Sequence, residues 1–205
     1  MSIELDQVIQ DFATCLKRVD ARRPQALNAR SKEPFQPGIG PHSEAEVVAM
    51  VVDDMAQFAP GLYKGKLITN VPYPESPRQK CDLCILSGPM NEWAIEVKML
   101  RFLGDNGKVN DNILMHILSP YPNHRSAVTD CEKLATSSIA LKKAIMIYGF
   151  DHDEWPLAPA IEAFESLARL RTRIGVRIVA EFNGLIHPIH DRGKVYAWQI
   201  EGKVA

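Results

Sequence analysis

Residues 81–100 read CDLCILSGPMNEWAIEVKML, and this stretch decides the fold. From position 92 to 99 the side chains alternate between two kinds, with the period of a β-strand. One face carries Trp93, Ile95, Val97 and Met99, and the other carries Glu92, Ala94, Glu96 and Lys98. The run 81–87 also has strand length, and a Gly-Pro turn at Gly88 separates the two runs. The stretch therefore predicts two neighbouring strands joined as a hairpin.

The flanking sequence predicts further elements around this hairpin. Ser43 and Glu46 form a capping-box pattern that starts a helix extending to position 58. The other expected helices span about 3–21, 110–118, 123–136 and 157–171, and the other expected strands span about 64–71, 142–150, 176–182 and 194–200. This order predicts an α/β fold with a mixed central sheet flanked by helices.

We expect a single domain over residues 1–205, because this length supports one substantial core. Its parts are an N-terminal helix (1–21), a loop or linker rich in Pro and Gly (22–41), a core (43–150) and a C-terminal α-β-β extension (151–205). No apolar run reaches the roughly 18 residues of a membrane span, and the acidic start is unlike a signal peptide. These features predict a cytoplasmic protein without a membrane partner.

The formal net charge is −1, which gives no global signal for a nucleic-acid partner. If the chain binds a polyanion, its basic residues must be gathered locally, and a divalent metal must supply part of the positive charge. Four cysteines in 205 residues form no dense disulfide framework and are compatible with reduced thiols.

Three side chains of the hairpin suggest a chemistry. Asp82 is an isolated acid in an apolar run, where an ionised carboxylate is costly unless a cation compensates it. In a paired hairpin Asp82 and Glu96 can lie side by side, and two adjacent carboxylates repel unless a metal or a shared proton lies between them. Such oxygen ligands suit Mg²⁺ or Mn²⁺. Lys98 would lie nearby, where its ammonium can orient a water and offset charge on a phosphoryl group.

The helix that begins after Ser43 adds a further acid. At 100° per residue, Glu44 falls within the apolar stripe of Val47, Val48, Val51 and Met55. An acid on this stripe could reach the same cation directly or through water. Acids are also favoured in a first helical turn by the helix dipole alone, so this second explanation stays open.

Together these features resemble the αβββαβ core of the PD-(D/E)XK nucleases, the restriction-endonuclease-like fold. The resemblance covers residues 43–150: the helix with Glu44, three strands with Asp82 on the second and Glu96-Val97-Lys98 on the third, then a helix and a strand. Cys81 stands where the motif's proline would precede Asp82, and Pro77 lies five residues earlier.

The resemblance implies a metal-dependent endonuclease that hydrolyses DNA, in restriction, defence or repair. Mg²⁺ or Mn²⁺ would be bound by Asp82, Glu96 and the backbone carbonyl of Val97, with Glu44 supporting the metal shell, and Lys98 would serve the attacking water. A homodimer would place one site on each strand of a duplex.

Basic residues flank the motif and are the predicted contacts to the DNA backbone. They are Arg78, Lys80, Arg101, Lys108, His124, Arg125 and Lys133. Ordinary surface charge is the competing interpretation for each of them. Asp130 and Lys133 are expected as an exposed pair, although Lys133 could also touch a phosphate.

Two alternatives compete with the nuclease hypothesis, and one further pair of candidate ligands stays open. The chain could be a catalytically silent nucleic-acid- or protein-binding module on the same fold. Cys81 and Cys84 could bind zinc with Cys131 or a histidine, but residues three apart on a strand point to opposite faces. His187 and His190 could be a ligand pair, but loop histidines without an acidic partner are usually polar surface.

Overall fold

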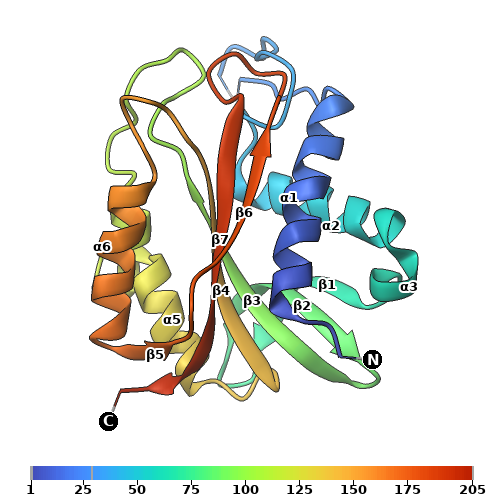
Figure 1. Ribbon diagram of the computed structural model, residues 1–205, viewed down its shortest axis with the longest axis vertical. Coiled ribbons are helices and arrows are strands. Elements are labelled where there is room, and N and C mark those ends of the chain that lie inside the picture. Colours follow the sequence, from blue (N-terminus) through green and yellow to red (C-terminus); the bar gives the residue numbers. More distant parts are fainter. Residues whose placement is uncertain (1, 29, 205) are drawn as a thin grey trace.

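The computed structural model describes residues 2–28 and 30–204 and contains a mixed sheet between two layers of helices (Figure 1). In chain order the elements are α1 (Leu5–Ala21), α2 (Glu44–Phe58), α3 (Pro60–Tyr63), β1 (Leu67–Tyr73), β2 (Ser76–Ser87), β3 (Met90–Leu100), α4 (Met115–Leu118), the 3₁₀ turn η1 (Pro122–His124), α5 (Ala127–Thr136), β4 (Lys142–Phe150), α6 (Ala158–Arg169), β5 (Thr172–Ile174), β6 (Ile178–Asn183) and β7 (Arg192–Lys203). The α/β class and the flanked mixed sheet predicted from the sequence are confirmed.

The sheet has seven strands in the order β1-β2-β3-β4-β7-β5, and β6 also pairs with β7. Strands β1, β2 and β3 form an antiparallel meander, and β4 then runs parallel to β3. A parallel neighbour requires a crossover connection, which here contains α4 and α5. The predicted hairpin of β2 and β3 and the predicted central position of β4 are both confirmed.

Each face of the sheet is covered by its own helices. Helices α1 and α2 lie on one side of the sheet, and α5 and α6 lie on the other (Figure 1). Strand β3 is buried on both faces: Trp93, Ile95 and Val97 pack toward α1 and α2, whereas Ala94 packs toward α5. Polar side chains of β3 on the α5 face are therefore enclosed between the sheet and a helix.

Helix α2 begins as the sequence predicts. The Ser43 hydroxyl accepts a hydrogen bond from the Glu46 backbone N–H at 3.4 Å, and the Glu46 carboxylate accepts one from the Ser43 backbone N–H at 2.9 Å. This reciprocal cap satisfies two helix-terminal donors and fixes the first turn of α2. Glu44, the first residue of α2, is thereby held close to β3.

Some sequence predictions differ from the structure. The segment 22–41 is not a free linker along its whole length, because Ile39 is fully buried and its N–H donates to Asp20 at 2.9 Å. Strand β5 was not predicted, since three residues are too few to show a period. Within the described residues, no helix has both the length and the apolar character needed to cross a membrane.

Candidate active site

The register of β2 and β3 brings Asp82 and Glu96 together. Leu83 pairs with Ile95, and beyond this pair the Asp82 carboxylate accepts a hydrogen bond from the Val97 N–H at 2.8 Å. The Asp82 side chain thus takes the place of a backbone acceptor at the end of the β2–β3 ladder. Burial raises the pKa of Asp82 above its usual value, against the lowering effects of a hydrogen bond to Glu96 and of Lys98.

Glu96 is the most enclosed acid of the hairpin, with 2% of its side chain exposed. Its Oε1 accepts a hydrogen bond from the Tyr73 hydroxyl at 2.5 Å and lies 2.6 Å from Lys133 Nζ. Burial and the negative charge of Asp82 raise the pKa of Glu96 to about 7, although Lys133 opposes this effect. Glu96 therefore holds a proton at mildly acidic pH that an exposed glutamate would have lost.

Lys98 lies between two acids that belong to different helices. Its Nζ is 2.8 Å from Asp130 Oδ2 on α5 and 3.9 Å from Glu44 Oε1 on α2. Nζ also donates to the backbone carbonyl of Val97 at 3.4 Å. Burial lowers the pKa of Lys98, but Asp130 and Glu44 raise it more, so its pKa lies above the usual value. Lys98 is therefore a buried, permanently charged cation at neutral pH.

Glu44 joins helix α2 to strand β3. Its Oε2 accepts a hydrogen bond from the Met99 N–H at 2.5 Å, and its side chain is about one-third exposed. Burial raises the pKa of Glu44, whereas Lys98 and the Met99 N–H lower it. The helix dipole alone does not explain the position of Glu44, because its carboxylate also contacts β3, the strand that carries Glu96 and Lys98.

Asp130 and Lys133 are not the exposed pair expected from the sequence. Asp130 is buried, and Lys133 Nζ lies 2.7 Å from Asp130 Oδ1 as well as 2.6 Å from Glu96. Asp130 lies on the same stripe of α5 as Ala127, Cys131 and Leu134, all of which are buried. This helical spacing was the available signal, and it should have placed Asp130 against the sheet.

Tyr73 was not singled out from the sequence. It is the last residue of β1, is 2% exposed, and lies under the ammonium of Lys133 at 4.8 Å from the ring centroid. Burial, followed by the charge of Glu96, raises the pKa of Tyr73 above its usual value, so its hydroxyl stays a hydrogen-bond donor. A tyrosine at a strand end has no sequence signature that would indicate this contact.

The charges of the site do not balance. Glu44, Asp82, Glu96 and Asp130 carry four negative charges when ionised, and Lys98 and Lys133 carry two positive ones, which leaves an excess of two. Each of the four carboxyl pKa values is raised, with burial as the largest cause. One divalent cation carries the charge that would complete the balance, and carboxylate oxygens are its preferred ligands.

The chemistry of the donors therefore fits Mg²⁺ or Mn²⁺, while the present contacts are between acids and ammonium groups. Among residues 2–28 and 30–204, no three His, Cys, Asp or Glu side chains are already gathered as a metal-binding group. Asp82 and Glu96 are the adjacent pair that would hold a cation, with Glu44 nearest to them on α2. The carbonyl of Val97 is the backbone oxygen of the same strand segment and is contacted by Lys98.

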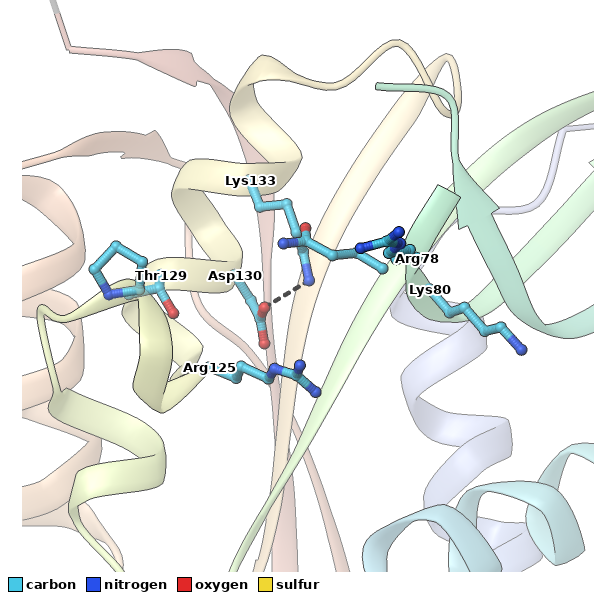
Figure 2. A pocket seen from close by; sticks show the side chains of 8 residues that line it. Arg78, Lys80, Arg125, Thr129, Asp130 and Lys133 are labelled. Carbon is cyan, nitrogen blue, oxygen red and sulfur yellow. Dashed lines mark hydrogen bonds and ion pairs between the residues drawn. The ribbon is translucent and has the colours of Figure 1, made fainter. Parts of the chain in front are cut away.

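The predicted basic contacts divide into two groups. Arg78, Lys80, Arg125 and Lys133 line one pocket of about 360 Å³ beside the acids, together with Gln79, Pro122, Thr129 and Asp130. Figure 2 shows Arg78 and Lys80 on the β2 side of this pocket, with Arg125, Asp130 and Lys133 on the α5 side. Arg101 lies apart from it: its guanidinium donates to the Gly40 carbonyl and lies 3.8 Å from Asp105. Lys108 is exposed in the loop after β3, and His124, with Arg125, lines a neighbouring pocket that contains Glu44 and Lys98.

The two cysteines of β2 do not point to opposite faces, contrary to the sequence argument. Cys81 and Cys84 both pack in the apolar cluster on the α5 face, and a hydrogen bond that the Cys81 thiol donates to Cys84 is the largest cause of the raised pKa of Cys81. The regular alternation is lost beside Asn70, which adopts a positive φ of 58° between the pairs Thr69–Leu83 and Val71–Cys81. All four cysteines are buried free thiols.

The sequence suggested that the histidines near the C-terminus are polar surface residues, but the structure buries them. His187 and His190 are fully buried, and their Nε2 atoms lie 3.9 and 3.3 Å from Asp105 Oδ1. Their acidic partner comes from the loop after β3, about 80 positions earlier in the chain, which sequence spacing could not reveal. This group is separate from the acids around Glu96.

Comparisons of the chain with protein-family models, with curated proteins and with solved structures found no match.

Proposed function

We propose that the chain is a divalent-metal-dependent endonuclease that hydrolyses phosphodiester bonds of DNA, with Asp82, Glu96 and Lys98 at the centre of its active site. The observation that carries the proposal is the partly buried cluster of four acids and two lysines across β3, with Glu96 and Asp130 fully enclosed. Buried charges are expensive, and a cluster with an unbalanced charge and raised acid pKa values is more typical of functional sites than of structural ion pairs.

The order of elements supports the same proposal. The run α2-β1-β2-β3-α5-β4, with an antiparallel meander followed by a parallel strand, supports the resemblance to the αβββαβ core. The acids stand on the second and third strands of this meander, and the additional glutamate stands on the helix that precedes it. Since folds host many functions, the argument for hydrolysis rests on the acids and lysines.

The side chains would divide the work according to their charges. Asp82 and Glu96 would hold the cation, which when bound supplies charge to stabilise the transition state and lowers the pKa of a coordinated water. Lys98 stays protonated, so it cannot act as the base; it would orient the attacking water and offset negative charge on the phosphoryl oxygens. Asp130, at 2.8 Å, keeps the ammonium of Lys98 in place.

Hydrolysis of linear and supercoiled DNA in the presence of Mg²⁺ or Mn²⁺ tests the proposal. We expect Asp82→Asn, Glu96→Gln and Lys98→Met each to abolish cleavage while the circular-dichroism spectrum stays that of the parent. Lys17→Gln, which changes an exposed residue of α1, a helix that carries no residue of the site, is the control and should cut like the parent. Cleavage that persists in all three site variants would overturn this assignment of the active site. No cleavage by the parent with either metal would instead favour a binding module without catalysis.

A further inference from the structure

We propose that the pocket beside the acids binds the terminal phosphate of a nucleic-acid strand, so that the endonuclease cuts more readily near a phosphorylated end or nick than elsewhere. This inference rests on the proposed function and names the substrate feature that the same site recognises. The pocket is the one lined by Arg78, Lys80, Arg125 and Lys133 from two walls. Below it is called the basic pocket.

Three cations of the basic pocket have no acidic partner. Arg78, Lys80 and Arg125 are exposed, and none of them forms an ion pair within residues 2–28 and 30–204. Lys133 differs, because it contacts both Glu96 and Asp130. Basic side chains from two separate elements that share one pocket repel one another unless an anion lies between them. An anionic ligand therefore matches the charge of the basic pocket.

The backbone around the α5 wall adds to this positive potential. Arg125 adopts a left-handed conformation (φ 49°) immediately before α5, and Ser126 caps the helix. Thr129, in the first turn of α5, lines the basic pocket. The N-terminal end of a helix carries partial positive charge, which favours an anion. The side chains and the helix end thus act in the same direction.

The charge and the size of the basic pocket favour a terminal phosphate over a phosphate within a chain. A terminal phosphate monoester carries about −1.5 to −2 charges at neutral pH, whereas a phosphodiester carries only one. Three cations without partners match the monoester better. The volume of about 360 Å³ is near the lower end of the roughly 300–1,000 Å³ typical of small-ligand sites, so it suits one end group.

The basic pocket also adjoins the acids that would perform hydrolysis. Lys133 lines the basic pocket and contacts Glu96, and Asp130 lines it and contacts Lys98. A strand whose end is held there would have its nearest phosphodiester close to Glu96. In the reaction the oxygen of a water forms a bond to phosphorus, the bond from phosphorus to a sugar oxygen breaks, and that oxygen takes up a proton to leave as an alcohol. The other product is a new phosphate monoester.

Binding to oligothymidylates that differ only in their ends tests this inference. Three labelled probes would be compared by fluorescence polarisation in Ca²⁺, which limits cleavage: one with a 5′-phosphate, one with a 3′-phosphate, and one with hydroxyl groups at both ends. We expect one phosphorylated probe to bind at least about tenfold more tightly than the hydroxyl probe. Inorganic phosphate should compete for this difference, since it shares the recognised group.

Variants then assign the preference to the basic pocket. Arg78→Gln combined with Arg125→Gln should make all three probes bind equally, while Lys17→Gln on α1 should keep the preference. Equal binding of all probes by the parent, or a preference that survives in the double variant, would overturn the inference. DNA cleavage with Mg²⁺ that does not depend on the end group would overturn the inference but leave the proposed function standing, whereas no cleavage of any substrate would remove the proposed function itself.

Discussion

Asp54 and the acids across β3 differ in how far neighbouring cations balance their negative charge. Asp54 on α2 is fully buried and contacts two arginines of the α1 region: Arg18 Nε at 2.7 Å and the guanidinium of Arg22. Burial, the largest single effect, raises the pKa of Asp54, but Arg18, Cys15 and Arg22 together outweigh it, and the pKa lies below its usual value. The acids across β3 are instead in excess over their lysines, and their pKa values are raised.

The difference separates an acid whose charge is balanced by two arginines of the protein from acids whose charge is not balanced by their lysines. Under our proposal a divalent cation completes this balance. Ionisation of Asp54 stabilises the folded protein, because Arg18 and Arg22 both contact its carboxylate. Within the described residues neither arginine forms a salt bridge with another acid. Ionisation of the acids across β3 is less favourable in the folded protein, because their pKa values are raised. Functional sites commonly retain such unfavourable electrostatics at a cost in stability.

The same chemical change in the two groups should have opposite results, and this is the largest effect we expect. Asp82→Asn should reduce DNA cleavage by at least about a hundredfold, since even residues behind a metal ligand contribute 10–100-fold. Its stability should stay equal to that of the parent or rise, because repulsion with Glu96 is removed. Cleavage rates and urea unfolding measure the two quantities.

Asp54→Asn should do the reverse. It removes the acid that two arginines share, so unfolding free energy should fall by on the order of 1–3 kcal/mol. Cleavage per folded molecule should stay unchanged. If Asp82→Asn destabilises the protein as much as Asp54→Asn does, the acids across β3 are structural ion pairs, and the distinction between the two groups is wrong.

The pH dependence of stability should also differ between the groups. The pKa of Glu96 rises from 4.5 to about 7 on folding, so between these values the folded protein binds more protons than the unfolded chain. The contribution of Glu96 to the stability of the folded protein therefore falls as the pH rises from about 4.5 to 7 and then levels off. Asp54 has a lowered pKa, so its contribution is present above pH 3.8 and is lost as the pH falls further.

Thermal unfolding with EDTA between pH 5 and 8 isolates the contribution of Glu96. Glu96→Gln should remove much of the decline, which corresponds to an effect on the order of 1–3 kcal/mol at pH 8, since one pKa unit is about 1.4 kcal/mol. Asp54→Asn should keep the decline. A parent protein whose melting temperature is flat over this range would contradict the raised pKa of Glu96.

The smallest effect concerns Tyr73. Its hydroxyl donates to Glu96 at 2.5 Å, and a donor favours the ionised carboxylate. Tyr73→Phe should raise the pKa of Glu96, so cleavage at pH 6.5 should fall by about three- to tenfold and recover toward the parent rate at pH 8.5. A loss that is equal at both pH values would mean that Tyr73 acts in another way than through the protonation of Glu96.

The hairpin could be predicted from the sequence because its pattern is local. Alternation over 92–99 fixed which residues share a face, and the short turn at Gly88 fixed which strands are neighbours, so Asp82 could be placed beside Glu96. Glu44 followed in the same way from helical periodicity and a capping box. These signals span fewer than 20 residues each and depend little on the remainder of the chain.

The parts of the site that the sequence did not reveal depend on distant contacts. Lys133 reaches Glu96 only because β4 runs parallel to β3, which brings the crossover helix α5 over this face of the sheet. Tyr73 meets Glu96 at the end of a strand pair whose register shifts between Pro72 and Tyr73. Tertiary arrangement decides such contacts, and no local spacing records them.

Calorimetric titration with Mn²⁺ tests the central claim most directly, which is that the acids across β3 form a divalent-cation site. At pH 6.5 we expect one saturable site whose binding heat depends on the ionisation enthalpy of the buffer, because the cation displaces the proton held by Glu96. Affinity should rise with pH up to about 7, and Asp82→Asn and Glu96→Gln should each abolish the heat. Absence of binding by the parent, or equal binding by these two variants, would contradict the claim.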